Sequence, residues 1–152
     1  MARSTALALA GLAALLVAVG GLVAFTGTPA APPSGRLRVV AAENVYGDIA
    51  AQIGGRRLQV TSVLSDPNAD PHLFEPGTRN GLAVAEAAVV IQNGAGYDSF
   101  MNRLEAAAPA SHRVVLTMAE LLGARTAKAN PHLWYDLPQL GRMAGAIAAA
   151  LT

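Results

Sequence analysis

Short β-rich runs alternate with helical patterns beyond residue 36, and this alternation limits the possible folds more than any other feature of the chain. The predicted strands lie at 37–42, 58–64, 88–91 and 114–116, and the predicted helices at 45–53, 82–87, 99–107 and 118–122. Gly54 and Gly55 end the first helix, because glycine readily adopts the left-handed conformation of a helix C-cap. Strands that are joined through helices predict crossover connections and a mostly parallel sheet.

The composition is that of one globular domain. Of the 152 residues, 53% are apolar and 14% are charged, which is too apolar for a disordered chain. We therefore predict an α/β fold, a single Rossmann-like lobe with a mostly parallel four-stranded sheet over residues 37–136. The net charge of +1 leaves no basic stripe, so nucleic acid is not an expected partner. Cysteine is absent, so any metal ion must be held by nitrogen and oxygen ligands.

The N-terminal segment predicts export. Arg3 precedes an uncharged apolar run from Thr5 to Phe25, and small residues at 28–30 suit a signal peptidase. We expect residues 1–30 to be a signal peptide or an uncleaved membrane anchor, since the run approaches the roughly 20 residues that span a bilayer. Residues 31–36 then form a linker. The remainder is expected to be extracytoplasmic, in the periplasm or at the cell surface, with membrane contact only through the N-terminal segment.

Two loops share one pattern. The sequence is Asp-Pro-His-Leu-Phe at 70–74 and Asn-Pro-His-Leu-Trp at 130–134. Both loops follow predicted strands, and ligands of open α/β sheets bind beyond the carboxyl ends of the strands. Proline stiffens each loop, and the aromatic residue can fix the direction of the histidine ring. A single loop histidine is usually unremarkable, but the repeated setting favours His72 and His132 as shared metal ligands. His112 lacks this setting and is assigned no role.

Two carboxylates are secondary candidates. Glu43 and Asp98 follow the first and third strands and could supply an oxygen ligand or a hydrogen bond to a histidine. The simpler interpretation, which we favour, is that Glu43 caps or solvates a helix start and Asp98 caps the helix from Ser99. Asp136 is similarly interpreted as the N-cap of a final helix.

At these residues the chain resembles the cluster A-I, or TroA-like, substrate-binding proteins of zinc and manganese ABC transporters. The resemblance runs from about Leu37 to the end and includes both histidine loops, residues 42–49 and residues 90–98. It implies a divalent metal ion, zinc or manganese, as the ligand, an ABC permease and its ATPase as partners, and no enzymatic activity. It also implies two α/β lobes joined by a long helix. The first lobe would contribute His72 and His132, and the second lobe a His or Glu and an acidic residue.

The chain departs from that family pattern in its last segment and in two motifs. Residues 137–152 resemble only the start of the joining helix, with Leu137, Leu140, Met143, Ala144, Ile147 and Leu151 on one apolar face. We expect a truncated chain whose apolar face has nothing to pack against: a gene fragment, a functional short form, or part of a split protein with a separately encoded second lobe. No His-rich loop lies between Leu73 and Asn130, so the sequence leaves zinc and manganese open. No lipobox cysteine follows the apolar run.

Other classes fit less well. Gly94 and Gly96 suggest a nucleotide-binding loop, but Ser99 replaces the third glycine of that motif. A hydrolase lacks support, since the sequence has no G-x-S-x-G, H-E-x-x-H or Walker lysine. A surface adhesin or interaction module of the same fold, without metal delivery, stays as the alternative.

Overall fold

A computed structural model describes residues 35–66, 68–124 and 130–152. The predicted signal peptide or anchor at 1–30, and the linker up to residue 34, lie outside these ranges. Of the helices that are described, none is long and apolar enough to cross a membrane.

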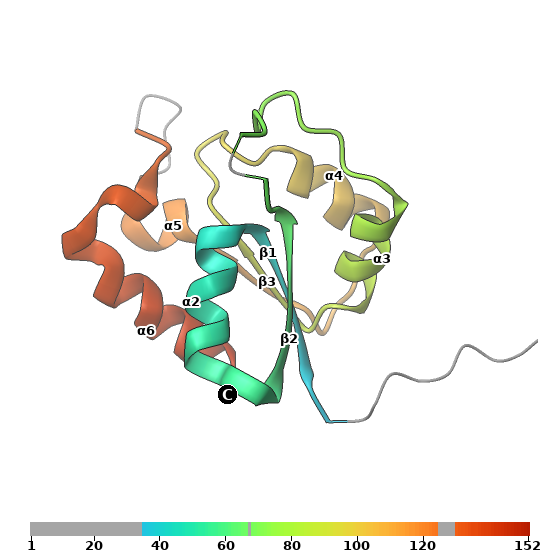
Figure 1. Cartoon of the computed structure of the whole chain (residues 1–152), viewed down its shortest axis with the longest axis horizontal. Coiled ribbons are helices and arrows are strands. Elements are labelled where there is room, and N and C mark those ends of the chain that lie inside the picture. Colours follow the sequence, from blue (N-terminus) through green and yellow to red (C-terminus); the bar gives the residue numbers. More distant parts are fainter. Residues whose placement is uncertain (1–34, 67, 125–129) are drawn as a thin grey trace, which may run out of the picture. The chain divides into compact units, whose positions relative to one another are not determined.

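The described residues form a four-stranded parallel sheet with the strand order β2-β1-β3-β4 (Figure 1). The strands are β1 (Leu37–Glu43), β2 (Leu58–Leu64), β3 (Val89–Gln92) and β4 (Val114–Thr117). In the register of the sheet, Val39 of β1 pairs with Val60 of β2 and with Val89 of β3. The predicted α/β fold with a mostly parallel four-stranded sheet is confirmed.

Helices cover both faces of the sheet, so that three layers result (Figure 1). One face carries α2 (Asn44–Gly54), α5 (Met118–Leu122) and α6 (Leu140–Ala150), and the other carries α3 (Thr78–Glu86) and α4 (Phe100–Ala107). Short 3₁₀ turns lie at η1 (Gly55–Arg57), η2 (Leu133–Tyr135) and η3 (Leu137–Gln139).

Alternate residues of the inner strands face opposite helical layers. Val39 and Ala41 of β1 pack with α2, α5 and α6, whereas Val40 and Ala42 pack with α3 and α4. All four are buried, which explains why β1 is apolar throughout rather than alternating with polar residues. Full burial of a large apolar side chain contributes roughly 1.5–3 kcal/mol, so these two cores hold the strand ends in place.

The last helix differs from its prediction in two ways. It begins at Leu140 rather than at residue 137, because Pro138 lies in the preceding 3₁₀ turn and leaves Leu137 69% exposed. The expectation that its apolar face has nothing to pack against was wrong. Met143 and Ile147 are fully buried, and α6 contacts α2 and β4.

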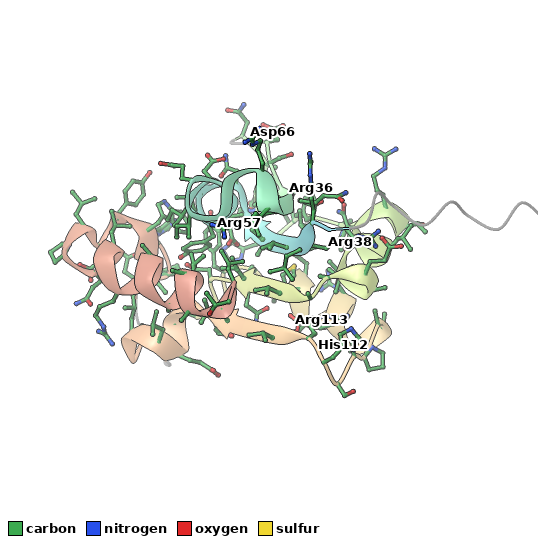
Figure 2. All side chains as sticks on the ribbon, turned by 90° about the horizontal axis from the view of Figure 1, so that it is seen from below. Arg36, Arg38, Arg57, Asp66, His112 and Arg113 are labelled. Atoms are coloured by element: carbon green, nitrogen blue, oxygen red, sulfur yellow. The ribbon has the colours of Figure 1, made fainter. Side chains whose placement is uncertain are left out.

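Charged side chains separate along the direction of the strands. Figure 2, seen from below, shows a basic group on and beside the segments that lead into the strands. This group comprises Arg36, Arg38, Arg57, His112 and Arg113. Arg38 forms an ion pair with Glu86 at 2.6 Å. Five acidic residues instead occupy the carboxyl ends of the strands and the segments that follow them, namely Glu43, Asp66, Asp70, Asp98 and Glu120.

Candidate metal centre

The two histidine loops have the same local geometry. The backbone N–H of His72 donates to Oδ1 of Asp70 at 2.8 Å, and that of His132 donates to Oδ1 of Asn130 at 3.0 Å. The proline between them has no N–H of its own, so the turn closes on the side chain two residues before the histidine. This shared turn presents both histidines to solvent.

The surroundings of the His132 ring favour one tautomer. Its Nδ1 lies 3.0 Å from Oδ1 of Asn130, the same oxygen that accepts the backbone N–H of His132. Because an amide oxygen can only accept, Nδ1 carries the proton and donates it. The lone pair is therefore on Nε2, which is the arrangement of a histidine whose second nitrogen binds a metal ion.

Each loop is anchored by the aromatic residue that follows its histidine, but in a different layer of the fold. Phe74 packs edge to face on Phe100 of α4, with ring centroids 5.0 Å apart. Trp134 packs edge to face on Tyr46 of α2 at 6.3 Å. The His72 loop is thus fixed to one side of the sheet and the His132 loop to the other.

Tyr97 lies between the two histidines. Its ring centroid is 6.1 Å from that of His72 and 5.4 Å from that of His132, and it also contacts Trp134 at 5.0 Å. The two loops, anchored on opposite faces, therefore both contact Tyr97 beyond the carboxyl end of β3. Their role as ligands stays a prediction.

Glu43 is buried at the same edge. It lines a pocket of about 290 Å³ together with Tyr97, His132, Trp134 and other residues of the loops. The side chain is 4% exposed, and neither carboxyl oxygen has a hydrogen-bond partner among the described residues. Burial, and then the charge of Asp98, raise the pKa of Glu43 to about 9, so the carboxyl is protonated at neutral pH. Glu43 precedes α2, but its side chain does not cap that helix.

Asp98 holds the loop that follows β3. Its Oδ2 accepts the backbone N–H of Asn93 at 2.6 Å, and its Oδ1 accepts that of Gly94 at 2.8 Å. Burial raises the pKa of Asp98, and these two N–H groups oppose the shift. Both oxygens are thus occupied within the loop that carries Tyr97. The sequence favoured Asp98 as a cap of the following helix, but its side chain instead accepts these two hydrogen bonds from the preceding loop.

Asn93 and Tyr46 are site residues that the sequence analysis missed. Asn93 is fully buried, and its side chain connects α2, the loop after β3 and the segment before His132. Tyr46 of α2 donates its hydroxyl to Oδ1 of Asn93 at 2.6 Å. The sequence showed only an Asn-Gly pair after a strand, which is a common turn signal. Nothing local revealed that the asparagine side chain points into the protein.

Within residues 35–66, 68–124 and 130–152, no group of three or more His, Asp or Glu side chains stands ready to hold a metal ion. The structure brings together two histidines and one nearby buried carboxyl. The fold and this edge are those of a ligand-binding α/β protein, with the ligand expected beyond the carboxyl ends of the strands.

Residues 39–152 match the family described as ZnuA, zinc-uptake complex component A, periplasmic, and the chain belongs to this family. It is a family of solute-binding proteins rather than of enzymes, as the resemblance implied.

Known relatives agree with this assignment. The manganese-binding lipoprotein MntA of Bacillus subtilis (strain 168) is 29% identical over 109 residues, which cover 68% of this chain and 35% of MntA.

Two solved structures share the fold. The periplasmic zinc-binding protein TroA of Treponema pallidum has a TM-score of 0.66 and 20% identity, covering 77% of this chain and 44% of TroA. The manganese-bound periplasmic metal-binding protein of Candidatus Liberibacter asiaticus has a TM-score of 0.55 and 14% identity, covering 75% and 51%. This chain spans about half of these solved structures and about a third of MntA.

Proposed function

We propose that this chain is the metal-binding lobe of an extracytoplasmic solute-binding protein, which passes a divalent metal ion to an ABC permease and its ATPase. The observation that carries this proposal is the meeting of His72 and His132 on either side of Tyr97 at the carboxyl edge of the sheet. Membership of the zinc-uptake family supports the same function. The apolar N-terminal run supports export of the chain by a signal peptide or an anchor.

His72 and His132 are the proposed ligands. Neutral imidazole binds zinc, and the contact of Nδ1 with Asn130 leaves Nε2 of His132 as the proposed ligand atom. Two nitrogens do not complete a zinc site, which takes four ligands, or a manganese site, which takes more oxygen. Glu43 is the proposed source of a further oxygen, with loss of its proton on metal binding, because its carboxyl lines the pocket beside His132 and has no hydrogen-bond partner among the described residues. Asp98 supports the site indirectly by holding the Tyr97 loop.

A second lobe is the proposed source of the remaining ligands. The greater length of MntA and TroA supports this, since their matched parts cover 35% and 44% of those proteins. Closure of such a lobe over the exposed histidines would exclude water and strengthen coordination. The test is to add a separately expressed second lobe and to measure whether the affinity of this chain for the metal ion rises.

The metal ion is proposed to be zinc or manganese. With nitrogen ligands in common, divalent zinc binds more strongly than manganese, so two histidines alone favour zinc. The names of the relatives include both metals. Parallel titrations with each ion separate the two.

The test is isothermal titration of the purified chain with Zn²⁺ and with Mn²⁺, alongside the variants His72→Ala and His132→Ala. Each substitution is expected to lower the affinity by about 10-fold or more, because half of the histidine pair is lost. His112→Ala is the matched control, since His112 is exposed at the opposite end of the strands and should bind like the unmodified chain. Unchanged binding in the double variant of His72 and His132 would remove the proposal.

A further inference from the structure

Asn93 is the centre of a buried hydrogen-bond network. Besides accepting the Tyr46 hydroxyl at 2.6 Å, its amide Nδ2 donates to the carbonyl of Pro131 at 2.7 Å and to that of Gly94 at 2.9 Å. Its backbone N–H donates to Asp98 at 2.6 Å. The side chain is fully buried, so none of these partners can be replaced by bulk water.

The direction of the Asn93 amide is determined by its neighbours. Both carbonyl groups require a donor, so Nδ2 must face Pro131 and Gly94. Oδ1 is then left facing the Tyr46 hydroxyl, which donates to it. Tyr46 is itself fully buried in α2, and burial raises the pKa of its hydroxyl, so the donor proton is retained.

This network reaches the residue immediately before His132. In the described part of the chain, the other polar contacts of Asn130 and His132 stay within their own loop. The Pro131 carbonyl is the point at which this segment is bonded to Asn93, directly after β3, and, through Tyr46, to α2. Because Asn130 sets the tautomer of His132, a displacement of Pro131 would disturb both the position of the ring and the nitrogen that carries its proton.

We propose that Asn93, oriented by Tyr46, is the positioning residue for His132: it fixes the Pro131 carbonyl so that Nε2 of the histidine points toward the bound metal ion. This inference rests on the proposed function, in which His132 is a ligand. Asn93 does not touch the metal ion and acts only through the loop.

The experiment compares Tyr46→Phe and Asn93→Ala with Thr117→Val in the full chain. Thr117→Val is the matched control, since it also removes a hydroxyl that bonds a β3 side chain, Gln92 at 3.0 Å, but this hydroxyl bonds neither Asn93 nor Pro131. Two properties are measured: the tautomer of the His132 ring without metal, by long-range ¹H–¹⁵N NMR, and Zn²⁺ affinity by titration. Circular dichroism verifies that each variant is folded.

The proposal expects Asn93→Ala to lower Zn²⁺ affinity by about 10-fold to 100-fold, as for other residues that orient a metal-binding histidine. Tyr46→Phe should cause a smaller loss in the same direction, and it provides the test should Asn93→Ala fail to fold. In both, the metal-free His132 ring should change from the Nδ1–H form to a mixture of tautomers. Thr117→Val should leave both measurements unchanged.

The two proposals fail in different ways. If His132→Ala abolishes zinc binding but Asn93→Ala and Tyr46→Phe bind within twofold of the unmodified chain with an unchanged ring tautomer, the positioning role is overturned and the proposed function stands. If His132→Ala binds zinc normally, the proposed function is overturned. The metal-free NMR comparison then still decides whether Asn93 fixes the His132 ring.

Discussion

A charged carboxylate is costly where it is almost fully buried and has no hydrogen-bond partner, and Glu43 is 4% exposed with no such partner among the described residues. The protein avoids burying its charge by keeping the group protonated, since burial and then Asp98 raise the pKa of Glu43 to about 9. Asp98 differs because its two oxygens accept two backbone N–H groups. Two neighbouring acids thus have different surroundings at the same edge.

This raised pKa makes the stability of the metal-free protein depend on pH. Between about pH 4.5 and 9 the unfolded chain releases the Glu43 proton while the folded chain retains it, so stability falls as the pH rises. The contribution to the slope approaches about 1.4 kcal/mol per pH unit, the value for one proton. Urea denaturation at several pH values should show a flatter profile for Glu43→Gln. An equal slope in the variant would contradict the assignment.

The site was only partly predictable for reasons that these residues illustrate. His72 and His132 were found because their settings repeat, which is a local signal. Tyr97, Asn93 and the burial of Glu43 were not found, because each depends on contacts between segments distant in the sequence. Periodicity tells which face of an element is apolar, but it does not tell which polar group a neighbouring loop will cover.

At the level of elements, the predicted bounds agree with the structure where the apolar pattern covers the whole element. Where the pattern covers only part of an element, the predicted range is too short. The strand at 58–64 and the helix at 118–122 were predicted with their observed bounds. The helix predicted at 82–87 begins at Thr78 in the structure. The prediction missed its first turn because Arg79, Asn80 and Gly81 add no apolar signal there. The final helix was predicted too early, since the apolar pattern outweighed Pro138.

The final helix allows a direct test of its packing. Met143→Ala removes a fully buried side chain and should lower the free energy of unfolding by about 2–5 kcal/mol. Leu137→Ala, on the same predicted apolar face but 69% exposed, should change it by less than about 0.5 kcal/mol. Chemical denaturation monitored by circular dichroism measures both. Equal effects would mean that α6 does not dock on α2 and β4.

At the level of the whole molecule, the parallel sheet determines where chemistry can occur. All four strands end at one edge, so the loops that follow β2 and β3 and the segment that follows α5 are brought to the same side. The candidate ligands come from two of these segments, and Tyr97 comes from the third. A chain with antiparallel strands would place such loops at alternate ends. The architecture therefore explains why the two candidate histidines, far apart in sequence, lie at one edge of the sheet.

The separation of charged residues between the two ends of the strands has a kinetic consequence. Among the described residues, Asp66, Asp70 and Glu120 lie toward the histidine end of the strands, whereas Arg36, Arg57 and Arg113 lie toward the other end. We expect this separation to act as a dipole that draws a divalent cation toward the histidine end during diffusion and repels it from the arginine end. Electrostatic attraction of this kind is weakened by salt, since the Debye length shrinks to about 10 Å at 0.1 M.

Zn²⁺ should therefore associate more slowly as ionic strength rises, while its dissociation rate changes little. Stopped-flow fluorescence can measure both rates, because Trp134 is the single tryptophan and its ring centroid lies 5.4 Å from that of His132. Asp66→Asn, which removes a charge from the wall of the pocket, should reduce the salt dependence, and an association rate that is insensitive to salt would contradict the dipole. The arrangement of charges would then steer an incoming cation toward the histidine edge before any ligand touches it.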